Sequence, residues 1–334
     1  QRLYVDSRTM GDGSAASLCT VLREGAANLH LRDLSLSAKR LGPRFLEALT
    51  GFLGAGCPCL CKLSLEANFS VDCVELRDSG APALHALSQA FQHTPSLSVL
   101  KVVHRGDSTP PGFLTQWMEA WHSADASLGS SCAPRCALSL EGTIINADMA
   151  LHLGHLVCAS TAPALVRSLI LRGTQCKSRD VTAFSVAVCS HDRTAKSSTL
   201  QTLDMSGNHI DVEGAEAVSR LLHQSVLHNS LTTLDLSENP LRGQSLCLLC
   251  NGLRGNSALL SLSLQACQLE GDILCRNGDC DSLFVESHLQ TLLLDGNSSL
   301  GDSGVRAMSS GLARSHFLQT LSLEGPYSPS AFLL

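Results

Sequence analysis

The sequence predicts an α/β solenoid of about eleven repeats, in which a short strand, a turn and an outer helix or loop alternate. A leucine-rich motif recurs every 28 to 31 residues in the second half of the chain. Within the motif, leucines occupy alternate positions, as they do in a strand that buries one side. An apolar helical pattern follows several copies after a glycine. The clearest copies are LQTLDMSGNHI from Leu200, LTTLDLSENPL from Leu231, LLSLSLQACQL from Leu259, LQTLLLDGNSSL from Leu289 and LQTLSLEGP from Leu318.

Weaker copies of the motif extend the array towards the N-terminus. They are RLYV, LRDLSLS from Leu31, LCKLSLEAN from Leu60, LSVLKVV from Leu97, CALSLEGTII and VRSLILRGT from Val166. Each copy predicts one parallel strand, since one repeat cannot bury its apolar side alone and must stack on its neighbours. We expect strands at Leu3, Leu34, Leu63, Leu100, Leu138, Leu169, Leu203, Leu234, Leu262, Leu292 and Leu321.

The turn after each strand is marked by the residue three positions beyond the last apolar residue of the motif. This residue is Asn in the copies at Asn68, Asn208, Asn239 and Asn297, and Cys267 replaces it in one repeat. Its side chain is expected to be buried and to bond the backbone of adjacent turns. Helices are then predicted after Gly13, Gly80, Gly214 and Gly304, including residues 214–223 and 304–313.

The tetrapeptide Gly301-Asp302-Ser303-Gly304 matches the surroundings of the nucleophilic serine in trypsin-like proteases. A catalytic serine needs a positioned histidine, an acid and an oxyanion hole, and the sequence gives no signal for them. Gly304 aligns with Gly214 of an earlier repeat. We therefore interpret the tetrapeptide as the connection between a strand and a helix.

Composition narrows the classes of function. The 334 residues are 44% hydrophobic but only 4% aromatic, which indicates a thin and repetitive core. A formal net charge of -6 argues against nucleic acid or an anionic membrane as a partner. The chain has no apolar run of the roughly 18 residues that a membrane span requires. Because it begins at Gln1, we expect a single repeat domain over residues 1–334 that is part of a longer protein.

The units LQTLDMSGNHIDVEGAEAVSRLL and LTTLDLSENPLRGQSL resemble ribonuclease-inhibitor-type leucine-rich repeats. The resemblance is specific from Val166 onward and looser before it. It implies a right-handed horseshoe with a concave parallel β-sheet and convex α-helices. Known members include the ribonuclease inhibitor, Nod-like receptor sensors, the GTPase-activating protein of Ran, tropomodulin and ciliary proteins. They share a scaffold and not a chemistry.

The segment from 104 to 134 is too long for an ordinary loop and helix, so we expect an irregular insertion or an enlarged repeat there. It contains Trp117 and Trp121, which are four residues apart and would share one face of a helix. Such aromatic residues are mostly core. The alternative is that one of them is exposed as an anchor for a partner.

Fifteen cysteines could hold disulfides or zinc. No two cysteine pairs have the spacing of a structural zinc site, so we expect free thiols, no metal and no cofactor. This usage fits a reducing, cytoplasmic compartment. Asn68-Phe69-Ser70 and Asn297-Ser298-Ser299 match glycosylation sequons, but burial at the turn should make both asparagines structural.

Two classes of function follow from the resemblance. The first is a non-catalytic scaffold for protein–protein interaction, for example in a cytoskeletal or ciliary assembly. The alternative is a GTPase-activating protein, or the sensor region of a Nod-like receptor. The comparable polar signal here is Arg172, with Lys177, Arg179 and Asp180. This pattern is too common to favour GTPase activation, so the scaffold is the main hypothesis.

The candidate docking residues are strand side chains that point away from the leucine side. In the C-terminal half, the acidic residues at these positions are Asp204, Asp235, Glu238, Asp295 and Glu324. Closer to the middle the same columns hold Lys101, His104 and Arg172, so the face is expected to change sign along the array. The acidic part predicts a partner with a basic segment. An exposed sheet could also carry acids merely for solubility.

Overall fold

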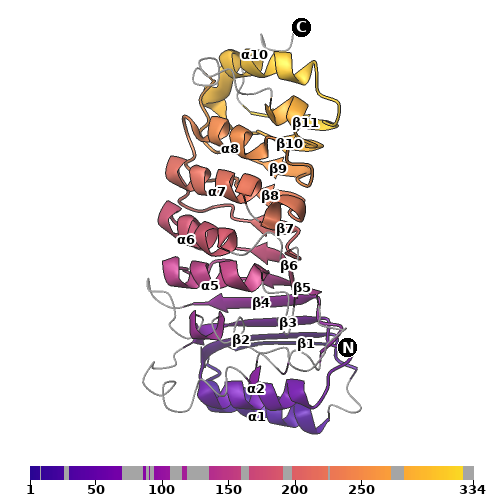
Figure 1. The fold of residues 1–334 in the computed structure, drawn as a ribbon. Coiled ribbons are helices and arrows are strands. Elements are labelled where there is room, and N and C mark those ends of the chain that lie inside the picture. Colours follow the sequence, from indigo (N-terminus) through magenta and orange to yellow (C-terminus); the bar gives the residue numbers. More distant parts are fainter. Residues whose placement is uncertain are drawn as a thin grey trace. The chain divides into compact units, whose positions relative to one another are not determined.

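A computed structural model describes the chain as two compact units, Gln1–Ile170 and Leu171–Leu334. The residues that it describes are 1–7, 9–25, 30–69, 86–87, 90, 94–105, 115–118, 135–158, 165–190, 198–224, 226–271 and 282–325. Both units are built from the same alternation of parallel strands and helices (Figure 1). A single repeat domain over the whole chain remains a prediction.

The described residues of the first unit form six parallel strands that pair in chain order. The strands are β1 (Arg2–Ser7), β2 (Asp33–Leu41), β3 (Lys62–Phe69), β4 (Val99–His104), β5 (Arg135–Ser139) and β6 (Leu165–Ile170). Its helices include α1 (Asp12–Glu24), α2 (Pro43–Gly54) and α5 (Ala147–Cys158), and residues 115–118 are also helical. Pro43 suits the first turn of α2, where the missing N–H has no intrahelical partner to lose.

In the part of the second unit that the structure describes there are five strands of three residues each, again parallel and in chain order. The strands are β7 (Thr202–Asp204), β8 (Thr233–Asp235), β9 (Ser261–Ser263), β10 (Thr291–Leu293) and β11 (Thr320–Ser322). The helices are α6 (Ser178–Cys189), α7 (Val212–Gln224), α8 (Ser245–Leu253) and α10 (Gly301–Leu312). Short helical turns lie at Val226–Asn229, Ser282–Glu286 and Ser298–Leu300.

The predicted strand leucines are the core of both units. Every predicted strand is present, and the leucine at the centre of each strand from β2 to β10 is at most 1% exposed. These leucines are paired in register on adjacent strands, so their side chains lie side by side. Examples are Leu203 with Leu234 and Leu262 with Leu292. Leu3 and Leu321 are half-buried, since each of their strands has one described neighbour.

Buried asparagines connect successive turns of the second unit. Asn239 Nδ2 donates to the carbonyl oxygens of Met205 and Leu236, at 2.9 Å each, and Asn239 Oδ1 accepts from the Ile210 N–H at 3.0 Å. In the repeat that lacks Asn, Cys267 Sγ donates to the Leu236 carbonyl at 3.2 Å. The structural role predicted for this position is therefore confirmed here. Equivalent bonds are made by Asn208 and Asn297.

The prediction that Asn68 is buried at such a turn is wrong, because Asn68 is an exposed residue of β3. In the second unit, the residue before each turn asparagine has a positive φ, for example 64° at Gly207, and this rotates the asparagine inward. Ala67 is not among the positive-φ residues. The strand therefore continues, and its alternation buries Ala67 and Phe69 while Asn68 points outward. Because Asn68 is exposed, burial is no argument against glycosylation at this residue.

The protease-like tetrapeptide Gly301–Gly304 forms the first turn of α10. Gly304 lies close to the preceding repeat, since a Cβ added at Gly271 would come within 2.3 Å of the Gly304 nitrogen. Gly214, its counterpart in α7, is equally confined, because a Cβ there would lie 2.8 Å from Ser178 Oγ. The tetrapeptide is therefore the start of the helix itself and not a connection that precedes it, and the contacts give its Gly304 a packing role.

The eleven cysteines in the described ranges are free thiols. Burial raises the pKa to about 12 for Cys19, Cys136, Cys176 and Cys267, which keeps their reactive thiolate forms scarce. We predict that these four react slowly with a thiol reagent at pH 8 while the protein is folded. In denaturant without reductant, all fifteen cysteines should react. A smaller number of reactive thiols would indicate disulfides, and stoichiometric zinc in elemental analysis would contradict the metal prediction.

Among the described residues, no helix is both long enough and apolar enough to cross a lipid bilayer. Most of the predicted insertion at 104–134 lies outside the described residues, and so do Trp121 and most of the helix predicted after Gly80. Trp117 is described, and its side chain is 1% exposed. It is therefore part of the core and is not an exposed anchor.

Candidate protein-binding surface

None of the helices that the structure describes in the second unit covers one face of its sheet. The helices α6, α7, α8 and α10 lie on the other side of its strands (Figure 1). We call the helix-free side the open face, and it consists of the side chains that alternate with the buried leucines. These are Thr202, Asp204, Thr233, Asp235, Ser261, Ser263, Thr291, Leu293, Thr320 and Ser322.

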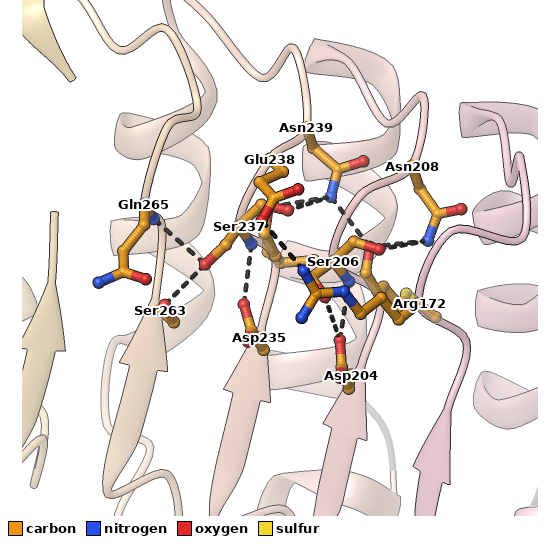
Figure 2. A network of polar contacts seen from close by, with 12 residues as sticks. Arg172, Asp204, Ser206, Asn208, Asp235, Ser237, Glu238, Asn239, Ser263 and Gln265 are labelled. Carbon is orange, nitrogen blue, oxygen red and sulfur yellow. Dashed lines mark hydrogen bonds and ion pairs between the residues drawn. The ribbon is translucent and has the colours of Figure 1, made fainter. Parts of the chain in front are cut away.

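Asp204 and Asp235 lie next to each other on this face, because they pair in register on β7 and β8. Asp204 Oδ1 accepts from the Ser206 N–H at 2.9 Å and from Ser206 Oγ at 2.6 Å, and Asp235 Oδ1 accepts from the Ser237 N–H at 2.9 Å (Figure 2). No Lys, Arg or His within the described ranges forms an ion pair with either carboxylate. Two aligned carboxylates on neighbouring strands repel each other, and a cation bound between them would relieve the repulsion.

Asp295 is held more tightly than these two. Its carboxylate accepts hydrogen bonds from Ser322 Oγ at 2.6 Å, from the Glu324 N–H at 2.5 Å and from Gln265 Nε2 at 2.5 Å. Burial alone would raise the pKa of Asp295, but these hydrogen bonds together outweigh it and lower the pKa. Asp295 therefore connects three repeats, and this role accounts for it without a partner. The side chain of Glu324 is exposed.

The basic candidates each have a local partner. Lys101 Nζ lies 2.8 Å from Glu141 Oε2, and Arg172 Nη2 lies 3.2 Å from Glu238 Oε1. His104 Nδ1 accepts from the Phe69 N–H at 3.2 Å, and burial lowers the pKa of this imidazole. The neutral ring that this acceptor role requires adds no positive charge to the face. The sequence analysis identified Lys101 and Arg172 as candidates, but it could not show that a carboxylate lies next to each of them.

Glu238 has a positive backbone φ, which is uncommon for a residue other than glycine. It occupies, with a φ of 59°, the turn position that is Gly207 with φ 64° in the preceding repeat and Ala266 with φ 52° in the next. A side chain in this left-handed region is unfavourable, and the position is usually left to glycine. The sequence signal for this feature was the change from Ser-Gly-Asn to Ser-Glu-Asn between two repeats. It marks Glu238 as a carboxylate that the turn itself does not need.

Metal binding has no clear candidate in the part of the chain that the structure describes. No group of three or more His, Cys, Asp or Glu side chains there is arranged to hold a metal ion. The chemistry that the open face offers is hydrogen bonding by hydroxyl groups and attraction of cations by carboxylates.

Two family models of leucine-rich repeats match the chain, one over residues 196–219 and one over residues 230–252. No curated protein matches it. Together with the repeated strands and helices, these matches show that the chain contains leucine-rich repeats. The ribonuclease-inhibitor-like subtype remains a prediction.

Several solved structures have a similar chain path. The complex of Rad7 and Elc1 from yeast includes a chain with 14% identity and a TM-score of 0.48, and the match covers 99% of this chain and 80% of that one. The leucine-rich repeat protein LegL7 from Legionella pneumophila has 16% identity and a TM-score of 0.41, with 94% and 97% covered. An internalin, InlF from Listeria monocytogenes, has 15% identity and a TM-score of 0.40, with 97% and 67% covered. Similarity at this level does not indicate what the chain binds.

Proposed function

We propose that this protein is a non-catalytic interaction scaffold whose open face binds a basic segment of a protein partner. The observation that carries the proposal is the aligned pair Asp204 and Asp235, which has no ion-pair partner among the described residues. Leucine-rich repeat arrays commonly present such extended surfaces to other proteins. A basic segment would supply the missing cation, and the hydroxyl groups of Thr202 and Thr233 would accept or donate hydrogen bonds beside it.

The form of the surface favours an extended segment. Successive strands of a sheet lie about 4.8 Å apart, so the open face repeats its side chains at that interval. A partner chain that crosses the strands would meet Asp204 and Asp235 first and then Leu293, because Ser263 on the strand between them is buried. Leu293 is half-buried and offers an apolar contact within an otherwise polar column. Basic side chains followed by an apolar one would therefore complement the face.

A cytoplasmic location, a cytoskeletal or ciliary assembly and the exclusion of nucleic acid and membrane partners remain parts of this proposal. The net charge of -6 supports the exclusion of nucleic acid and anionic membranes as partners. The residues considered for GTPase activation have other roles in the structure. Arg172 pairs with Glu238, and Asp180 Oδ2 accepts from the Lys177 N–H at 2.8 Å at the start of α6.

We predict that the double substitution Asp204→Lys and Asp235→Lys weakens partner binding by at least about tenfold, mainly through a slower on-rate at low salt. The partner would be recovered by affinity purification, and binding would be measured by surface plasmon resonance at several salt concentrations. A short synthetic peptide of alternating Arg and Ser serves as a defined second probe.

The control is Glu213→Lys with Glu216→Lys, which makes the same change of charge on exposed positions of α7. This variant should keep its affinity if the open face is the site. Asp295 is left unchanged, because its hydrogen bonds support the fold. Equal loss in both variants would mean that net charge alone governs binding, and unchanged binding in the Asp204 and Asp235 variant would reject the proposed surface.

A further inference from the structure

The ion pair between Arg172 and Glu238 crosses an entire repeat. The two residues are 66 positions apart in the sequence, and the turn of the repeat between them contains Gly207. A Cβ added at Gly207 would lie 3.8 Å from Glu238 Oε2, so the Glu238 side chain passes close to this glycine. Figure 2 shows Glu238 and Arg172 directed toward each other. The pair therefore lies along the end of the open face where Asp204 and Ser206 are bonded.

Nothing in the turn geometry requires this carboxylate. Ala266 occupies the same turn position in the next repeat with φ 52°, so a side chain without charge is accommodated there. Among the residues that the structure describes, the partner of the Glu238 carboxylate is the Arg172 guanidinium. The acidic group at this position is thus directed along the surface and not into the fold.

The pair is also exposed enough to exchange partners. The side chains of Arg172 and Glu238 are 52% and 57% exposed, and they meet through one N–O contact of 3.2 Å. Exposed pairs of this kind contribute little to stability, since water competes for both groups. A second guanidinium could replace Arg172 at Glu238 with little cost to the fold.

We infer that Arg172 occupies, in the free protein, the place at Glu238 that an arginine of the partner takes in the complex. The inference rests on the proposed function, because it assumes a basic segment on the open face. Arg172 then acts as an internal competitor. It neutralises Glu238 while the face is empty, and it lowers affinity for a basic segment whose arginine must displace it.

The test uses the full chain and the peptide of alternating Arg and Ser, with binding followed by fluorescence anisotropy at low salt. Removing the competitor by Arg172→Ala should tighten binding by roughly two- to fivefold. In the Glu238→Gln background the same substitution should give a clearly smaller gain, because the contested carboxylate is gone. Arg220→Ala, which removes a positive charge from an exposed position on α7, should leave binding unchanged.

Several outcomes would overturn the inference. Weaker binding in Arg172→Ala would show that Arg172 contacts the ligand itself. An equal gain in both backgrounds would show that Arg172 acts only through its general field, and no change in either would show that it does not compete. The proposed function fails separately, if the peptide binds the variant with Asp204→Lys and Asp235→Lys as well as it binds the unaltered chain.

Discussion

Replacing Asn239 with alanine is expected to lower the free energy of unfolding by about 3 kcal/mol, because the substitution removes buried hydrogen bonds to three backbone groups and takes away the acceptor of the Ile210 N–H. Asn239 is 1% exposed, and its amide bonds the Met205 and Leu236 carbonyls and the Ile210 N–H. Alanine supplies neither a donor nor an acceptor. Urea denaturation followed by circular dichroism would measure the loss, reported as the change in midpoint and slope.

Asn239→Cys is the matched control for this prediction. Cys267 fills the equivalent place in the next repeat, and its thiol donates to the Leu236 carbonyl at 3.2 Å. Cysteine at 239 should therefore recover part of the lost stability, although it cannot replace the bond from Ile210. If cysteine and alanine cost the same, hydrogen bonding by this side chain does not hold the turns together.

The second large effect is expected at Gly252, inside α8. A Cβ added there would lie 2.7 Å from both the Cα and the carbonyl oxygen of Ser219 in α7, so the two helices must move apart. We expect Gly252→Ala to destabilise the protein by about 2–3 kcal/mol, despite the better helix propensity of alanine. Thermal unfolding monitored by circular dichroism would show the lower midpoint.

Gly13 supplies the contrast, because a Cβ at this exposed position of α1 would meet nothing within 4 Å. Gly13→Ala should leave stability unchanged or raise it by up to about 1 kcal/mol. A loss at Gly252 no larger than the change at Gly13 would mean that close packing of α7 and α8 is not what excludes a side chain there.

The residues of single repeats were enough to predict much of this fold. The spacing of Leu203, Leu234 and Leu262 located their strands, since a buried side at period two is a local property. The roles of Asn208, Asn239 and Cys267 also followed from position in the motif. Asn68 shows the limit of such reasoning. It has the same place in the motif, but its outward direction depends on whether the preceding residue adopts a positive φ.

The candidate surface shows a similar division. Alternation within the strands put Asp204 and Asp235 on one face, and their register then follows from the repeat length. The strand positions in the sequence could not predict that Lys101 pairs with Glu141 or that Arg172 pairs with Glu238. They also could not predict that Trp117 is only 1% exposed. The sequence by itself determined which residues face the open side and what charge they carry. Only the tertiary structure decided which charges are offset, because ion pairs depend on side-chain reach across repeats and on the space that a residue such as Gly207 leaves between them.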